Sequence, residues 1–318
     1  MGPTASGKTA LALALAESLG GEIVSVDSAQ VYRGLDIGSA KPDDDERARV
    51  PHHLIDRVEI TEPYSAARFV DDALTAIRQI RSRGCRPILA GGTMLYFKAL
   101  FVGLADMPAG DAAVRARLDA EAAAQGWQAL HQRLARHDPL AASRIHRNDA
   151  QRIARALEVL ELSGRTLSEL QATTRPALDE PVVALALLPD DRAWLHRRIE
   201  ARLAGMRLAG FDEEVRRLHA RGCSPELPAL RSVGYRQALE ALAAGRFEQE
   251  ADGGPPRWPS RAVAATRQLA KRQLTWLRSQ GEAVAIGCDV LTLSEQCRMA
   301  LDTVQSGPAI RLFPPDHR

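Results

Sequence analysis

"MGPTASGKTALALALAESLG" (residues 1–20) contains the most specific pattern in the chain. Gly2, Gly7, Lys8 and Thr9 match G-x-x-x-x-G-K-[ST], a loop whose backbone N–H groups cradle phosphate at the start of a helix. Such a loop normally follows a buried strand, whereas here only Met1 precedes it. We therefore expect an upstream strand to complete the fold, and the chain as given to be poorly stable without it.

A diphosphate or a nucleotide is the predicted ligand of this loop. The backbone N–H groups of residues 4–9 would surround a phosphate, Lys8 would add a positive charge, and the Thr9 hydroxyl would bind Mg²⁺, the predicted metal cofactor. Because the loop recognises charge and geometry, ATP stays an alternative ligand, and a turn that only begins a helix is another interpretation. The predicted contact residues are Gly2, Pro3, Thr4, Ala5, Ser6, Gly7, Lys8 and Thr9.

Strand and helix patterns alternate through the first hundred residues. "EIVSVD" (22–27), "HHLID" (52–56) and "PILAGG" (87–92) predict strands, and the helical patterns between them end at Gly20 and Gly84. This order predicts an α/β fold with a parallel sheet flanked by helices. Ligands of such sheets lie beyond the carboxyl ends of the strands, which would bring the 2–9 loop, Asp27 and "GGT" (91–93) together.

A purely helical region interrupts this alternation. Residues 111–175 are predicted to form an all-helical insertion domain, and 1–110 with 176–318 the catalytic core. "VVALALLP" (182–189) reads as a strand at which the sheet resumes, and "ADGGPPRWPS" (251–260) as a loop between helices.

Composition excludes several classes of protein. The 318 residues include no apolar run near the roughly 18 that a membrane helix needs, and the four cysteines show no C-x-x-C or zinc-like spacing. A cytoplasmic protein without membrane contact is expected.

His52 and His53 are adjacent, point to opposite faces of a strand and are interpreted as structural. The segment 261–278 carries five basic and no acidic residues. It predicts either a phosphate-binding track or the solvent face of an amphipathic helix.

Several motifs in fixed order resemble those of bacterial tRNA dimethylallyltransferases, also called tRNA isopentenyltransferases. They are "GPTASGKT" (2–9), "SVDSAQVYRGLDIGSAKP" (25–42), "GGTMLYFKAL" (91–100), "RSVGYRQ" (231–237) and "TRQLAKRQLTWLR" (266–278). The resemblance runs from Gly2 to about Arg278 and implies a P-loop NTPase-like fold. It also implies transfer of a dimethylallyl group from dimethylallyl diphosphate to N6 of the adenosine adjacent to the anticodon, position 37, in tRNA.

The resemblance implies roles for three catalytic residues, Asp27, Thr93 and Arg202. Asp27 would take a proton from the adenine amine as general base. From the residues alone, capping of its own turn and magnesium binding are equal alternatives. Thr93 would hold the amine or the diphosphate, with a bare turn as the alternative, and Arg202 would reach the diphosphate from the far side, with a solvated helix position as the alternative.

The implied partners are dimethylallyl diphosphate and the tRNA anticodon stem-loop, bound by a monomer whose insertion domain swings over the anticodon arm. A small-molecule kinase and an RNA-binding switch protein are the rival interpretations. The implied tRNA contacts are Asp27, Ser28, Ala29, Gln30, Thr93, Arg115, Gln151, Arg152, Ile153, Ala154, Arg155, Arg231, Ser232, Val233, Gly234, Tyr235, Arg236, Lys271, Arg272, Gln273, Leu274, Thr275, Trp276, Leu277 and Arg278. Tyr235 in particular would stack on a base.

Overall fold

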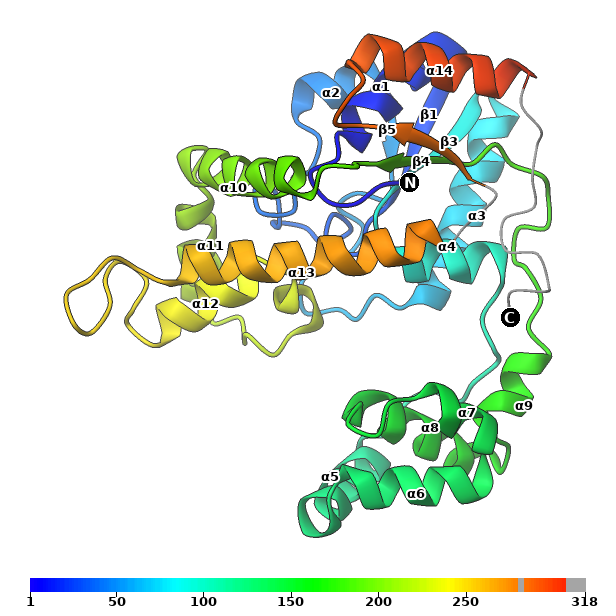
Figure 1. The fold of residues 1–318 in the computed structure, drawn as a ribbon, viewed down its shortest axis with the longest axis vertical. Helices are drawn as coiled ribbons and strands as arrows, with labels where there is room; N and C mark the ends of the chain where they lie inside the picture. Colours follow the sequence, from blue (N-terminus) through cyan, green and yellow to red (C-terminus); the bar gives the residue numbers. More distant parts are fainter. Residues whose placement is uncertain (280–282, 307–318) are drawn as a thin grey trace. The chain divides into compact units, whose positions relative to one another are not determined.

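The computed structural model describes residues 1–279 and 283–306, which form two compact units. Unit 1 comprises residues 1–101 and the chain from 178 onward, and unit 2 comprises residues 102–177 (Figure 1). Unit 2 overlaps the predicted insertion at 111–175, but it begins earlier and ends slightly later. The segments that lead into and out of its helices pack on each other: an added Cβ at Gly103 would lie 1.8 Å from the Arg175 carbonyl oxygen.

A three-stranded parallel sheet in the order β2-β1-β3 forms the first part of unit 1. It consists of β1 (Gly21–Val26), β2 (His52–His53) and β3 (Arg86–Gly91), so the prediction of parallel strands is confirmed, although β2 is shorter than predicted. Alternate side chains face opposite helices. Ile23 and Ile88 pack with α1 (Lys8–Leu19), whereas Val24 and Val26 pack with α3 (Ala66–Ser82) and α4 (Met94–Phe101).

The predicted strand at 182–189 is present as β4 (Leu185–Leu188), but it does not resume the first sheet. It pairs in parallel with β5 (Val284–Gly287), a strand that the sequence patterns did not predict. Met1 lies along the other edge of β4, because its amine donates to the Leu185 carbonyl at 2.7 Å and its carbonyl accepts from Leu187 N at 2.9 Å. A mainly apolar cavity of about 490 Å³ is lined by both β3 and β4. The expected upstream strand stays a prediction.

Helix ends in unit 1 follow the capping residues in the sequence. Gly20 ends α1 in the left-handed conformation, with its N–H on the Ala16 carbonyl, as predicted. Asp43 and Glu46 form a reciprocal capping box at α2 (Asp44–Arg49), so this acidic run begins a helix. The last described helix of unit 1, α14 (Leu293–Ser306), packs on α1.

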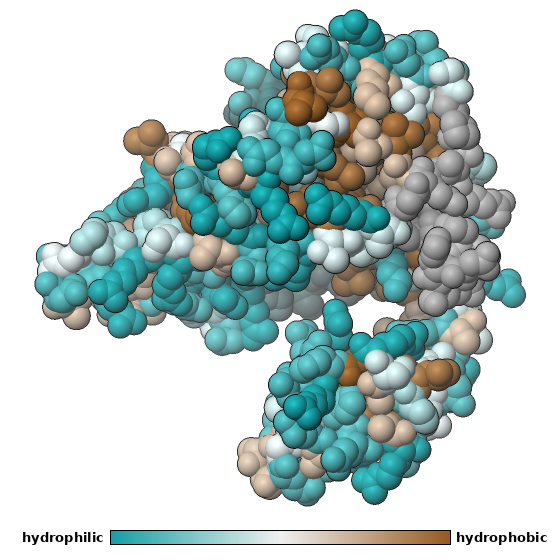
Figure 2. Space-filling view, viewed as in Figure 1, coloured by the Kyte–Doolittle hydropathy of each residue, from teal (hydrophilic) through white to brown (hydrophobic). Residues whose placement is uncertain are grey.

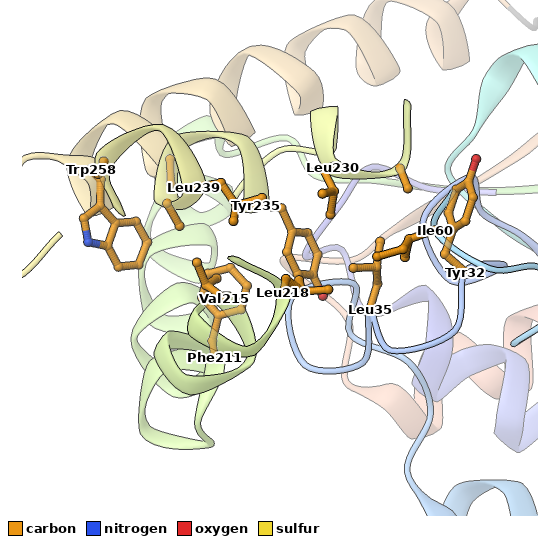
Figure 3. Close-up of a cluster of buried hydrophobic side chains, with 14 of the residues drawn as sticks. Tyr32, Leu35, Ile60, Phe211, Val215, Leu218, Leu230, Tyr235, Leu239 and Trp258 are labelled. Carbon is orange, nitrogen blue, oxygen red and sulfur yellow. The ribbon is translucent and has the colours of Figure 1, made fainter. Parts of the chain in front are cut away.

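Four helices and a short 3₁₀ turn pack with side chains of the 31–60 segment in a second hydrophobic cluster beside the sheets (Figure 3). They are α10 (Arg192–Leu208), α11 (Phe211–Ala220), the turn Pro228–Arg231, α12 (Tyr235–Ala243) and α13 (Trp258–Arg278). The predicted loop 251–260 is wrong at its end, because Trp258 already belongs to α13. Its indole is buried against Phe211 and stacks on Phe247, and Pro259 is tolerated in the first helical turn, where no N–H partner is required.

Unit 2 is entirely helical and has its own core. It consists of α5 (Ala112–Gln125), α6 (Trp127–His137), α7 (Pro139–Arg144), α8 (Ala150–Ser163) and α9 (Leu167–Ala172). Asp111, Asp138 and Asp149 cap three of these helices with their carboxylates, which explains why the chain turns at those positions. No helix in the described part of the chain is long and apolar enough to cross a membrane.

Glu22 of β1 makes the stability of unit 1 sensitive to acid. Its buried carboxylate accepts from Arg83 at 2.7 Å and contacts His53 Nε2 at 2.6 Å. The Arg83 guanidinium, opposed by burial, lowers the pKa of Glu22 from 4.5 to about 2. Since the folded pKa lies below the unfolded value, this stabilisation is present above about pH 4.5 and is lost as the pH falls towards 2. We expect Glu22→Gln to lower the melting temperature at pH 7, and the difference from wild type to shrink from pH 4.5 to 3; a constant difference would contradict this account.

Candidate active site

One cavity of about 590 Å³ in unit 1 brings the predicted catalytic and phosphate-binding residues together. The 2–9 loop, the carboxyl ends of β1 and β3, the 38–42 segment, α10, the 231–234 turn and α13 all contribute to its wall. The predicted residues that line it include Thr4, Lys8, Thr9, Asp27, Thr93 and Arg202. Parallel strands place their carboxyl ends on one edge, which is why residues so far apart in sequence meet here.

The 2–9 loop has the curved backbone that an anion site needs. Ala5 and Gly7 both have positive φ, at 64° and 95°, and Gly7 is the residue before α1, so successive N–H groups turn towards the helix N-terminus. The prediction that all N–H groups of 4–9 surround a phosphate is wrong in two places. Thr4 N donates to Gln273 Oε1 at 2.9 Å, and Ser6 N donates to the Pro3 carbonyl at 3.3 Å.

Two cations and one carboxylate dominate the electrostatics of the cavity. Burial, and then the positive charge of Arg202, lower the pKa of Lys8 from 10.5 to about 8, while Asp27 opposes this shift. Burial also lowers the pKa of the Arg202 guanidinium, and Asp27 again opposes. Two desolvated positive charges that repel each other are poised to receive an anion, because a bound diphosphate would relieve both effects.

Asp27 follows β1 and performs the turn-capping role that the sequence offered as an alternative. Its Oδ1 accepts from Ala29 N at 2.9 Å and from Gln30 N at 3.4 Å. The same carboxylate lines the cavity, so capping does not remove it from the site. Because the cap uses Oδ1, it fixes the carboxylate in one orientation, which a proton acceptor at a defined place requires.

Thr93 lies beside the Asp27 turn. Its hydroxyl accepts from Ser28 N at 3.0 Å and lies 3.3 Å from the Ser28 hydroxyl. Close approach of β3 to β1 depends on Gly91, since a Cβ there would lie 2.0 Å from the Val26 carbonyl oxygen. The glycines before Thr93 therefore bring the hydroxyl and the carboxylate to one edge, as the sequence predicted.

Three side-chain contacts that position this site were not recognised from the sequence. Gln273 reaches two loops at once, Arg198 Nε donates to the Ala5 carbonyl at 2.7 Å, and Glu214 accepts from the N–H groups of residues 36–38. The Glu214 contacts hold the segment that continues into the cavity wall at 38–42. The local sequence pattern does not distinguish a helical Glu or Arg that contacts a loop from one that contacts only solvent. These partners are therefore visible only in the folded structure.

Tyr235 cannot stack on a base, which corrects one predicted RNA contact. Its ring is 0% exposed, lies 5.2 Å from the Phe211 ring, and its hydroxyl donates to Glu214 Oε1 at 2.5 Å. Other predicted RNA-contact residues also have buried side chains, namely Ile153, Gln273, Leu274 and Leu277. The amphipathic spacing of these helices directs those positions into the core.

The basic stretch of α13 is partly paired. Arg261 donates to Glu240 at 2.9 Å and Arg267 pairs with Glu200, acids that lie on other helices and therefore escape a search along 261–278. Within the described part of the chain, Lys271, Arg272 and Arg278 are exposed and make no ion pair. Hydrophilic side chains cover the face of unit 1 across which α13 runs (Figure 2). Arg231 and Arg236 are exposed but pair with Glu226 and Glu240.

Within unit 2, two of the three predicted RNA-contact arginines converge on Glu158, whereas Arg152 pairs with Asp149. Arg115 Nε donates to Glu158 Oε1 at 2.9 Å and Arg155 donates to Oε2 at 2.6 Å. Glu158 is buried, whereas the Arg115 side chain is mostly exposed. The Arg115 pair joins α5 to α8, whereas the Arg155 pair lies within α8, and the role of these arginines towards RNA stays a prediction.

The prediction of Mg²⁺ binding concerns Thr9 of the 2–9 loop and stays a prediction. Among residues 1–279 and 283–306 there is no cluster of three His, Cys, Asp or Glu side chains suited to a metal. His52 and His53 make separate contacts, His52 Nδ1 with the Val50 carbonyl at 2.8 Å and His53 with Glu22, as their interpretation as structural residues predicts. Thr9 lines the cavity, and its hydroxyl is the oxygen donor that the 2–9 loop offers. A single hydroxyl donor fits a Mg²⁺ ion that phosphate oxygens would mainly hold.

Comparison with known proteins agrees with these observations. The family model described as IPP transferase matches residues 30–280. A tRNA dimethylallyltransferase from Paracidovorax citrulli is 57% identical over 301 residues, covering 91% of this chain and 85% of its own length. One from Halorhodospira halophila is 57% identical over 291 residues, with 91% and 92% covered. The crystal structure of a tRNA isopentenylpyrophosphate transferase from Bacillus halodurans is 34% identical, with a TM-score of 0.67 over 96% of this chain and 94% of that one.

Proposed function

The chain belongs to the IPP transferase family, and we propose that its unit 1 cavity transfers a dimethylallyl group from dimethylallyl diphosphate to N6 of the adenosine at position 37, next to the anticodon of tRNA. The transferase activity towards a tRNA adenosine follows from the family and from relatives at 57% identity. One observation carries the assignment of the site: a capped carboxylate, Asp27, lies in the same cavity as two desolvated cations, Lys8 and Arg202.

The reaction joins the amine nitrogen to the terminal allylic carbon and breaks the bond from that carbon to oxygen, so that diphosphate leaves. The exocyclic amine of adenine is a poor nucleophile, and its proton must be removed as the new bond forms. Asp27 accepts this proton at the oxygen not used by the turn. Thr93, hydrogen-bonded to the Ser28 backbone, fixes the amine or the first phosphate beside it.

Negative charge develops on the leaving diphosphate. Lys8 and Arg202, which carry positive charge into a desolvated cavity, stabilise it together with the remaining N–H groups of the 2–9 loop. The Thr9 hydroxyl would hold a Mg²⁺ ion, which when bound would supply further charge neutralisation. The P-loop NTPase-like fold belongs to the same proposal, supported by the 2–9 loop that leads into α1 beside a parallel sheet.

The anticodon stem-loop is the proposed RNA element. Lys271, Arg272 and Arg278 on α13 bind its phosphates, and the target adenine leaves its stack to enter the cavity. The protein acts as a monomer in the cytoplasm, where its tRNA substrate is found. A small-molecule kinase is the second candidate, because the 2–9 loop would also accept a nucleotide.

The test uses purified protein, Mg²⁺, dimethylallyl diphosphate and unmodified tRNA, with modified adenosine detected by mass spectrometry. Prenylated adenosine at position 37 supports the proposal. Turnover of ATP with small hydroxyl acceptors, and no modified adenosine, would favour the kinase. A tRNA in which position 37 is not adenosine is the control and should remain unmodified.

Unit 2 is expected to contribute to RNA binding and not to diphosphate binding. It has a separate core, and the 2–9 loop, Asp27, Thr93 and Arg202 all belong to unit 1. Replacing residues 116–170 by a short Gly/Ser linker should weaken tRNA binding by at least about tenfold while the affinity for inorganic diphosphate changes little. Both affinities are measured by titration calorimetry, and an equal loss of both would contradict the expectation.

A further inference from the structure

Gln273 on α13 connects the two loops that carry the reaction. Its side-chain Oε1 accepts from Thr4 N at 2.9 Å, and its Nε2 donates to the Gly92 carbonyl at 2.8 Å. The side chain is only 7% exposed, although its neighbours Lys271, Arg272 and Thr275 face solvent. Its position therefore differs from that of the RNA-contact residues among which the motif placed it.

The chemistry of this position requires an amide. The buried residue must accept a hydrogen bond from the backbone N–H of Thr4 and donate one to the backbone carbonyl of Gly92. A carboxamide does both, because its oxygen accepts and its nitrogen donates. A carboxylate would still accept from Thr4 N, yet it would bring a negative charge against the Gly92 carbonyl oxygen. A methionine would match the length and make neither bond. Both loops would then lose their buried partner.

Gly92 is shaped for this contact. A Cβ at position 92 would lie 2.6 Å from Gln273 Nε2 and 3.2 Å from the Gly2 carbonyl oxygen. The absence of a side chain thus lets the amide reach the backbone directly before Thr93. Because Thr4 belongs to the diphosphate loop, one side chain sets the spacing between the diphosphate site and Thr93.

We propose that Gln273 is a positioning residue for the transfer reaction, which holds the 2–9 loop and the Thr93 turn at the separation that attack of the amine on the allylic carbon, opposite the leaving diphosphate, requires. The inference rests on the proposed function. It assigns Gln273 an effect on the chemical step and none on tRNA affinity, whereas the family motif alone assigned it to RNA binding.

The test measures kcat, the KM for tRNA and the KM for dimethylallyl diphosphate in Gln273→Met, Gln273→Glu and Gly92→Ala. The matched control is Gln296→Met, because Gln296 is also a buried helical glutamine, whose Nε2 donates to the Leu291 carbonyl at 2.8 Å outside this cavity. We expect kcat to fall by about 10- to 100-fold in the three variants, with the KM for tRNA within about threefold of wild type. The control should keep kcat within about threefold.

The double variant Gln273→Met with Gly92→Ala distinguishes a shared contact from general damage. If both substitutions act by changing the same separation between the two loops, the kcat of the double variant is little lower than that of either single variant. A raised KM for tRNA with unchanged kcat would overturn the inference in favour of RNA contact, and a kcat as high as in the control would overturn it in favour of packing. No product from wild type would instead overturn the proposed function. Melting curves of all variants show whether a loss of activity is caused by unfolding. If Gln273→Met or Gly92→Ala unfolds, the kcat of Gln273→Glu, which keeps the hydrogen bond from Thr4 N, decides between positioning and packing.

Discussion

Asp27→Asn should lower the rate of dimethylallyl transfer by about 10²- to 10⁴-fold, the contribution typical of a general base. The asparagine keeps an oxygen that can accept from Ala29 N and Gln30 N, so the turn after β1 stays capped. It cannot accept the proton of the adenine amine. The rate is measured under single-turnover conditions with excess enzyme, so that binding does not limit it, and tRNA affinity is measured separately and should change little.

Asp27→Ala is the matched variant, since it removes both the base and the cap. If Asp27 acts as the base, the two variants lose similar rates at saturating substrates, and the alanine variant alone shows a weaker fold around residues 27–30. Near-normal transfer by the asparagine variant, with loss only in the alanine variant, would show that Asp27 serves the turn and that another group accepts the proton.

Lys8→Met should reduce transfer by about 10²- to 10³-fold, the usual effect of removing one donor that stabilises a developing oxyanion. The ammonium group lies in a desolvated cavity with Arg202, and burial and that charge lower its pKa to about 8. A lysine is charged below its pKa, so affinity for inorganic diphosphate should be full below pH 8 and fall as the pH rises above it. Calorimetric titration from pH 6.5 to 9.5 measures this fall.

Lys8→Arg is the control for charge. The guanidinium keeps its proton throughout this range, so the decrease above pH 8 should disappear while any titration of diphosphate itself remains. Identical pH profiles for wild type and the arginine variant would contradict the assignment of the pH dependence to Lys8.

The elements around the cavity follow from local patterns. The 2–9 loop, β1 and β3 were predictable because glycines with positive φ and short apolar runs act within a few residues of their own position. The same holds for the helices of unit 2, whose acidic caps mark each start. The two-stranded sheet was not predictable, because pairing of β4 with β5 joins segments about a hundred residues apart, and β5 has only four residues.

Side-chain directions account for the errors in the predicted RNA contacts and for the pairing of Arg267 in the basic segment 261–278. A helix motif shows that Gln273, Tyr235 and Arg267 are present, but not which neighbours surround them. Tyr235 is buried because α12 packs it against Phe211 and Glu214, and Arg267 is paired because α10 presents Glu200. The partners in each case lie more than twenty residues away, beyond the range of any local periodicity.

The identities of the candidate site residues could therefore be predicted from the sequence. Their burial and mutual contacts in the cavity could not. The proposed phosphate binding by Lys8 and Thr9 and the presence of a carboxylate at Asp27 depend on covalent structure and short-range turns. The desolvation that lowers the pKa of Lys8, the orientation of Asp27 and the Gln273 connection between Thr4 and Gly92 depend on packing. Burial and contacts between distant segments are properties of the folded chain, because they arise only when several elements remove water from the same space.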